Sequence, residues 1–226
     1  YIIQILFLSI ILNMSIEDEL KSTPAWRYPY PEIGEHFKNR DEQSILLFSY
    51  GSLMDVNSAS KTLSPTSLKT RRPAIGFNIK RIFDRDVPIK SGSKWPIPTD
   101  PKARGMLNVL PTQSKNDFVN GVLIDVTLDD IPNVLLREVG YDLIPIIVQE
   151  WDKGTTKIAY TFHAPQNSSY THSDILPRPG YYELTRDAAL QFGPVFYRLW
   201  FKTTFLSDGT PIENWDTRVQ SSSDFN

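Results

Sequence analysis

Short runs of apolar and β-branched residues recur along this chain, and most of them end at Gly, Pro, Asn or Asp. Such runs are typical of β-strands, because the turn residues supply the backbone conformations in which the chain can reverse. Helical patterns are fewer. This mixed order predicts an α+β fold and not a doubly wound α/β fold. The predicted strands are 45–50, 73–83, 104–110, 119–127, 144–151 and 156–163.

Three segments have the pattern of helices. One begins at residues 57–61, a second covers 129–139 with Asp129 or Asp130 near its start, and a third covers 185–205. The third contains too many apolar side chains for a polar surface helix. Gly193-Pro194 should kink or split it, because proline lacks the backbone N–H and its ring clashes with the preceding turn.

The N-terminal residues 1–44 are predicted to be an extension, partly extended or disordered, that precedes the main domain. Residues 1–12 are almost continuously apolar, but they are too few to span a bilayer and include no basic residue. We interpret residues 1–13 as an upstream extension of the reading frame, with Met14 as a natural start. A truncated signal sequence and an amphipathic docking segment are the alternatives.

Residues 15–43 mix charges, aromatic residues and prolines. Each proline biases its predecessor away from the helical region, so we expect an extended segment that wraps the domain surface. Its predicted anchors are Trp26, Tyr28 and Tyr30, and a disordered leader before Tyr28 is the alternative. Residues 208–226 are predicted to be a C-terminal tail.

A long loop is predicted between residues 84 and 104, which contain four prolines and no usable periodicity. Loops of this length in compact domains are often lids or binding loops, although a mobile loop without a function is the alternative. Trp95 is the residue of this loop that we expect to contact a ligand.

The length of 226 residues suits one sizeable core, and a second independent domain is not expected. The 24 basic and 26 acidic side chains are interspersed and give a formal net charge of −2. Such a surface has no positive field for nucleic acid or an anionic membrane, so we expect a small-molecule partner. The absence of cysteine excludes disulfides, a thiolate nucleophile and a cysteine-ligated metal, and it suits a cytoplasmic protein.

One apolar run ends abruptly in Tyr50-Gly51-Ser52-Leu53. Gly51 would allow either a turn with positive φ or a close backbone approach to a ligand, and Ser52 adds a hydroxyl beside amides that the turn leaves unpaired. An ordinary strand-ending turn is the alternative. The loop contains no arginine, so an anion bound there would have to be held by main-chain N–H groups.

A second segment begins with the predicted strand at Gly121 and continues through a short helix to Arg137-Glu138-Val139-Gly140-Tyr141. The two segments together resemble the γ-glutamylcyclotransferase-like superfamily, in which a Tyr-Gly-Ser loop holds the substrate and an Arg-Glu-x-x-Tyr unit supplies a catalytic glutamate. The resemblance covers roughly residues 45–207, the predicted single domain. Many members carry Asn where this chain has Leu53 and Asp where it has Leu135, and the second difference would fit a divergent subgroup with another leaving group.

The resemblance implies a mixed β-barrel or sheet flanked by a few helices. It implies an enzyme, an acyltransferase or lyase, that cyclises a γ-glutamyl amine, amide or peptide to 5-oxoproline by intramolecular aminoacyl transfer and releases the free amine. No cofactor, metal or stable membrane insertion is expected, and the protein would be a monomer or homodimer. Glu138 would be the catalytic base and then acid. The substrate-binding residues would be Tyr50, Gly51, Ser52, Leu53, Tyr141 and Tyr181.

Other interpretations of these residues stay open. Glu138 could be a solvated helix-end carboxylate paired with Arg137 or another basic group. Ser52 could be the nucleophile of a Ser–His pair, although the histidines lie in segments without a complementary motif and also lack metal-ligand spacing. Those histidines are His36, His163 and His172. The fold could also carry an amide-processing enzyme for another γ-glutamyl-like metabolite, or a non-catalytic small-molecule binding module.

Overall fold

A computed structural model describes residues 15–30, 33–38, 43–87, 98–166 and 168–216 of the chain. Trp95 and the apolar residues 1–13 lie outside the described residues, so the predictions made for them stay predictions. None of the helices in the described ranges is long and apolar enough to cross a membrane.

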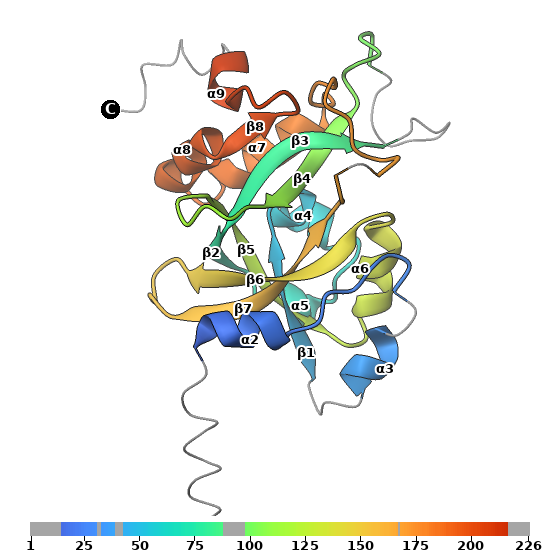
Figure 1. Ribbon diagram of the computed structural model, residues 1–226, viewed down its shortest axis with the longest axis vertical. Helices are drawn as coiled ribbons and strands as arrows, with labels where there is room; N and C mark the ends of the chain where they lie inside the picture. The colour runs from blue at the N-terminus through green and yellow to red at the C-terminus, as the bar shows by residue number, and fades with distance from the viewer. Residues whose placement is uncertain (1–14, 31–32, 39–42, 88–97, 167, 217–226) are drawn as a thin grey trace, which may run out of the picture.

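Five strands form a closed barrel in the order β1-β5-β2-β6-β7 (Figure 1). Neighbouring strands are antiparallel except at the closure, where β1 and β7 run parallel and Leu47 pairs with Tyr160. Closure pairs the strand edges, so the apolar runs of the sequence pack inward around one core. The barrel strands are β1 (Ser44–Ser49), β2 (Arg72–Phe77), β5 (Phe118–Thr127), β6 (Asp142–Glu150) and β7 (Thr156–His163).

A separate three-stranded sheet, in the order β4-β3-β8, lies above the barrel in Figure 1. It consists of β3 (Ile79–Asp86), β4 (Gly105–Pro111) and β8 (Thr204–Leu206). The prediction of a single strand over 73–83 is therefore wrong. Asn78 between β2 and β3 has a φ of 58°, a left-handed conformation that Asn tolerates better than most residues, and it directs the two halves into different sheets. The other predicted strands are confirmed to within two residues.

A buried guanidinium joins the sheet to the barrel. Arg81 on β3 has no exposed surface, and it donates hydrogen bonds to the backbone and side chain of Asn120 on β5 at 2.7 and 2.9 Å. It also donates to Thr204 on β8 at 2.8 Å. Buried donors need acceptors, and here they come from both layers, so these bonds fix the sheet on the barrel.

The predicted split of the third helix is confirmed. α7 (Tyr181–Leu190) and α8 (Pro194–Lys202) are separated at Gly193, whose φ is 94°. The predicted end at residue 205 is wrong, because Thr204–Leu206 pairs with β3 as β8. The shorter helices are α4 (Val56–Ala59), α5 (Pro65–Leu68), α6 (Ile131–Arg137) and α9 (Ile212–Trp215), with the 3₁₀ helix η1 (Ser52–Met54). The predicted α+β class, a barrel and sheet flanked by a few helices, is confirmed.

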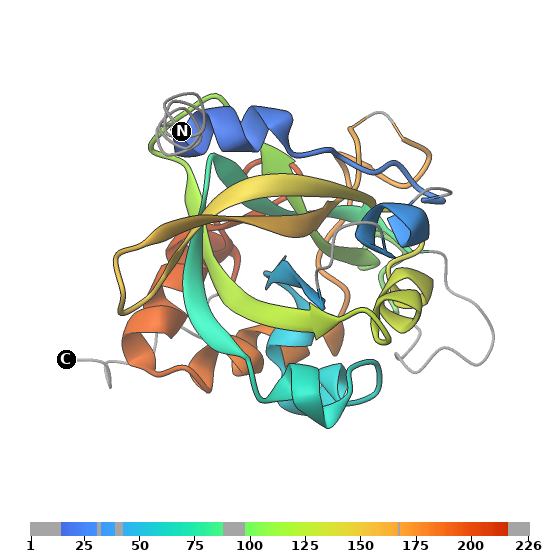
Figure 2. The same cartoon turned by 90° about the horizontal axis from the view of Figure 1, so that it is seen from below.

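The expectation of extended chain over 15–43 is wrong at two places, because α2 (Ile16–Ser22) and α3 (Ile33–Lys38) are helical. No proline interrupts 16–22, and the Ser15 hydroxyl accepts a hydrogen bond from the Asp18 amide and so caps α2. α2 lies along the outside of β6 and β7 (Figure 2).

Two of the three predicted anchors in the following segment are confirmed. Trp26 is partly buried against the core and pairs its backbone with Leu143, while Tyr30 is buried and its hydroxyl donates to the Tyr141 carbonyl. Tyr28 is exposed, although its backbone N–H donates to the Asp142 carboxylate and its ring lies edge-on to the Tyr30 ring, with centroids 5.7 Å apart. The domain boundaries at residues 45 and 207 stay predictions.

Candidate functional site

Strand β1 delivers the Tyr50-Gly51-Ser52-Leu53 loop to a fixed position. Tyr50 is buried and donates a hydrogen bond from its hydroxyl to the Phe162 carbonyl on β7 at 2.7 Å, and the Met54 N–H closes the turn on the Gly51 carbonyl at 2.9 Å. Gly51 has a φ of −126°, so the turn does not require a left-handed residue. A Cβ at Gly51 would instead lie 2.9 Å from the Tyr181 hydroxyl oxygen. Close approach, and not positive φ, is therefore the reason for glycine here.

Glu138 is positioned by the end of α6. The helix ends at Arg137, and Glu138 is the C-cap residue whose N–H still bonds to the Val134 carbonyl. Gly140 has a φ of 80°, and a Cβ there would lie 2.8 Å from an Arg85 guanidinium nitrogen. Both facts favour glycine, because the left-handed conformation strains other residues and the space is already filled. The turn then places Tyr141 directly before β6.

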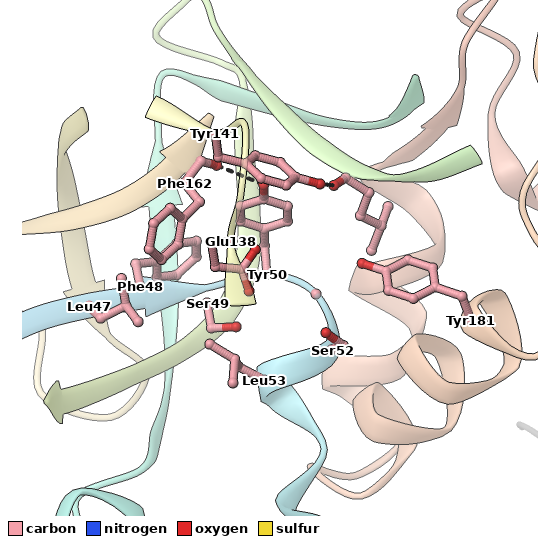
Figure 3. A pocket seen from close by; sticks show the side chains of 12 residues that line it. Leu47, Phe48, Ser49, Tyr50, Ser52, Leu53, Glu138, Tyr141, Phe162 and Tyr181 are labelled. Atoms are coloured by element: carbon pink, nitrogen blue, oxygen red, sulfur yellow. Dashed lines mark hydrogen bonds between the residues drawn. The ribbon is translucent and has the colours of Figure 1, made fainter. Parts of the chain in front are cut away.

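The loop and the helix end meet at one small cavity (Figure 3). Its volume is about 30 Å³, room for about two water molecules. Figure 3 shows the Glu138 side chain in the middle of the group, near Tyr50 and Ser49, with Ser52 and Leu53 along the loop and Tyr181 on the far side. The cavity is lined by Leu47, Phe48, Ser49, Tyr50, Gly51, Ser52, Leu53, Leu107, Glu138, Tyr141, Phe162 and Tyr181.

Three tyrosines line this cavity together with Glu138. Burial raises the pKa of Tyr50, Tyr141 and Tyr181 above the ordinary value, and the negative charge of Glu138 adds to each rise. The three phenols therefore stay protonated near neutral pH and can donate hydrogen bonds but cannot act as bases. The Tyr141 hydroxyl donates to the Leu107 carbonyl at 3.0 Å, which ties the cavity wall to β4.

Arg137 connects the helix end to the loop across 85 residues of sequence. One of its terminal nitrogens donates to the Ser52 hydroxyl at 2.8 Å and to the Ser58 hydroxyl at 2.7 Å, and the other donates to the Ser58 carbonyl and the Thr62 hydroxyl. Its Nε lies 3.5 Å from a Glu138 carboxylate oxygen. Both side chains are less than one-fifth exposed. The alternative interpretation of Glu138, a solvated carboxylate paired with a basic group, is therefore met only in part. Glu138 is paired with Arg137, but it is mostly buried.

The histidines give no support to a Ser–His nucleophile. None of the three lines the cavity, and the Ser52 hydroxyl is instead held by Arg137. His163 Nδ1 lies 2.6 Å from the Val109 carbonyl, and His172 faces Asp86. His36 packs against the Trp26 ring. Among the described residues, no group of three or more His, Asp or Glu side chains is placed to hold a metal ion.

The structure brings all seven candidate residues to this one cavity, although their roles stay predictions. The sequence did not identify Leu107 and Phe162 as walls, because both come from ordinary strand patterns with no local motif. Ser49 had a usable signal, since it immediately precedes Tyr50 at the end of the same strand.

No protein-family model and no curated protein matches the chain. Several solved structures are similar in fold, including the following two. A γ-glutamyl cyclotransferase is 15% identical over 70% of this chain and 86% of its own, with a TM-score of 0.50. YkqA from Bacillus subtilis is 17% identical with a TM-score of 0.54, and the match covers 73% of this chain but only 56% of YkqA. At these identities the likeness concerns the fold, and the chain has the γ-glutamylcyclotransferase-like fold.

Proposed function

We propose that this protein cyclises a γ-glutamyl amine, amide or peptide to 5-oxoproline and releases the free amine. The observation that supports this most is the position of Glu138, a mostly buried carboxylate that shares a small cavity with the Tyr50-Gly51-Ser52-Leu53 loop. Such an arrangement suits a substrate that carries an ammonium and a carboxylate on the same carbon. The loop would bind the substrate carboxylate, and Glu138 would face the ammonium. A γ-glutamyl group has both.

The reaction needs little covalent chemistry from the protein. The α-amino nitrogen of a γ-glutamyl group reaches its own γ-carbonyl in a five-membered ring, and holding the two groups together exploits a large effective molarity. Glu138 takes a proton from the α-ammonium, and the resulting amine attacks the γ-carbonyl carbon. Glu138 returns the proton to the leaving nitrogen as that C–N bond breaks. The ring nitrogen keeps one proton, and its remaining proton leaves through the same carboxylate to the departing amine or to water.

The charges that develop on the substrate need donors. Main-chain N–H groups of Gly51, Ser52 and Leu53 are proposed to hold the substrate carboxylate or the developing oxyanion. The protonated hydroxyls of Tyr141 and Tyr181 are further donors at the cavity wall. Arg137 does not have to touch the substrate in this mechanism. It holds Ser52 and Glu138 in one arrangement, which is a positioning role.

The cavity is too small for a γ-glutamyl group with every side chain in its present place. Its volume of about 30 Å³ is that of about two water molecules. Substrate entry therefore requires an outward movement of lining side chains. Side-chain rotamer changes on binding are common, so a small cavity in the free protein is compatible with this mechanism.

Glu138→Gln tests the proposal directly. It keeps the shape of the side chain but cannot accept the proton, so turnover should fall by at least about 10²-fold while the fold is retained. Asp142→Asn is the matched control, because Asp142 lies nearby in sequence but its carboxylate holds the Tyr28 backbone and does not line the cavity. The measurement is release of 5-oxoproline from a panel of γ-glutamyl compounds by wild type and both variants.

Four outcomes separate the alternatives. Loss in Glu138→Gln with retention in Asp142→Asn supports the proposal. Near-native release by Glu138→Gln excludes Glu138 as the proton carrier. If the wild type binds γ-glutamyl compounds in calorimetry but releases no product, the protein is a binding module. Release of an amine without 5-oxoproline would favour the alternative amide-processing reaction.

A further inference from the structure

A second, larger cavity of about 300 Å³ lies beside β3 and the segment that follows β7. It shares no lining residue with the Glu138 cavity, and its ligand does not have to be the substrate of the proposed reaction. Its polar walls include Asp84, Gln166, His172, Ser173 and Ser207. Ser173 and Ser207 also line an adjoining cavity of about 160 Å³. A volume of about 300 Å³ is at the lower end of the range for small-molecule sites.

Asp84 is the unusual group in this cavity. Asp84 is only 6% exposed, and its Oδ1 oxygen has no hydrogen-bond partner in the described part of the chain. Burial raises the pKa of Asp84 to about 6, and the neighbouring Asn108 amide and the Arg85 charge oppose this rise only in part. A buried carboxylate oxygen without a partner is costly, and native proteins rarely keep one without a use.

The basic groups near Asp84 already have other partners. The Arg85 guanidinium is stacked on the rings of Tyr141 and Tyr170 and donates to the Val139 carbonyl at 2.9 Å. Arg104 and His172 both face Asp86, at 3.0 and 3.4 Å. In the adjoining cavity Lys102 pairs with Asp174 at 2.8 Å. Asp84 therefore lines the cavity as a mostly buried carboxylate, and these four basic side chains of the described residues are held by other groups.

We propose that this cavity binds the ammonium group of a small primary amine, with the Asp84 carboxylate as its main partner. An ammonium carries three donors and no acceptor, and the cavity offers acceptors in the Gln166 amide oxygen and the Ser173 and Ser207 hydroxyls. The Ser207 hydroxyl donates to the Ile175 carbonyl at 2.7 Å and accepts from the Ile175 N–H at 3.2 Å, which leaves one lone pair of its oxygen for a further donor. A metal ion fits less well, because the described His, Asp and Glu side chains do not converge in threes. An anion would meet Asp84 without a compensating cation.

The test is calorimetric titration of the full chain with 1,4-diaminobutane, and with 1,4-butanediol as the neutral compound of the same length. The wild type should bind the diamine and not the diol. Asp84→Asn keeps the shape but removes the charge, and it should weaken diamine binding at least tenfold, the loss expected when a charge-assisted hydrogen bond is removed. Asp174→Asn is the control, because that side chain is 79% exposed and lines only the adjoining cavity.

The affinities of the variants can be compared only if each variant is folded, and urea unfolding of each will establish this. A second measurement needs no variant, since the carboxyl carbon signal of Asp84 in the wild type should shift on addition of the diamine and not of the diol. Equal diamine affinity in wild type and Asp84→Asn would overturn the proposal, and so would an equal loss in Asp174→Asn, which would indicate non-specific attraction to the acidic surface. Absence of any shift at Asp84 would overturn it as well.

Discussion

Gly51→Ala adds a single methyl group to the loop beside Glu138, at a point where the structure leaves no room for it. The new Cβ would lie 2.9 Å from the Tyr181 hydroxyl oxygen and 4.0 Å from the Leu107 Cβ. Tyr181 is 4% exposed, and its ring packs edge-on against Phe83 with centroids 6.4 Å apart. The hydroxyl must therefore move, and the ring that carries it has little freedom to do so.

The energetic effect is specific to the hydroxyl. Overpacking a core by one methyl group costs about 1–3 kcal/mol, and we expect a value near the lower end because the obstructing atom is the tip of a side chain. Tyr181→Phe removes this oxygen. Gly51→Ala should then cost at least about 1 kcal/mol less in the Tyr181→Phe background than in the wild type, a coupling typical of residues in contact. The backbone effect of replacing glycine is the same in both backgrounds, so the cycle cancels it.

Urea unfolding of the wild type, the two single variants and the double variant measures this coupling without knowledge of the substrate. Gly154→Ala is a poor control because its φ is 65°, whereas Gly76→Ala has a negative φ but contacts Phe48 and not Tyr181. Gly76→Ala should therefore show no coupling to Tyr181→Phe. Additive effects of Gly51→Ala and Tyr181→Phe would refute the close approach as the reason for glycine. Additive effects would also mean that the loop and α7 are not energetically coupled through this contact.

Sequence reasoning located the two halves of the candidate site because each has a local signal. An apolar strand that ends in Tyr50-Gly51 predicts a turn, and a short helix followed by Gly140 predicts that Glu138 lies at a helix end. Their meeting in space did not follow from local physics, since the Arg137–Ser52 contact joins residues 85 positions apart. It followed only from the order of motifs that resembles a known family.

The features that sequence missed depend on contacts between distant segments. The apolar pattern runs without a break through Asn78, and only the pairing of β2 with β5 and of β3 with β4 decides that the strand divides there. Thr204–Leu206 continues an apolar helix pattern, yet it finds an open edge on β3. The partnerless oxygen of Asp84 was also invisible, because a carboxylate in a loop-like sequence is usually solvated.

Two further perturbations test the interactions that hold the barrel and the loop. Arg137→Met removes hydrogen bonds to Ser52 and Ser58, so it should lower the free energy of unfolding by about 2 kcal/mol or more. It should also accelerate hydrogen exchange in residues 51–54. Unchanged exchange would mean that Arg137 does not restrain the loop. Glu150 on β6 is 5% exposed, and hydrogen bonds from Lys157, Lys153 and Arg72 lower the pKa of its carboxyl to about 2. Because the folded-state pKa lies below the unfolded value of 4.5, the stabilisation is complete above that pH and is lost as the pH falls toward 2. The free energy of unfolding of the wild type should therefore decline more steeply between about pH 5 and pH 2 than that of Glu150→Gln. Equal slopes in urea titrations across this range would show that these ion pairs contribute nothing to the stability of the barrel.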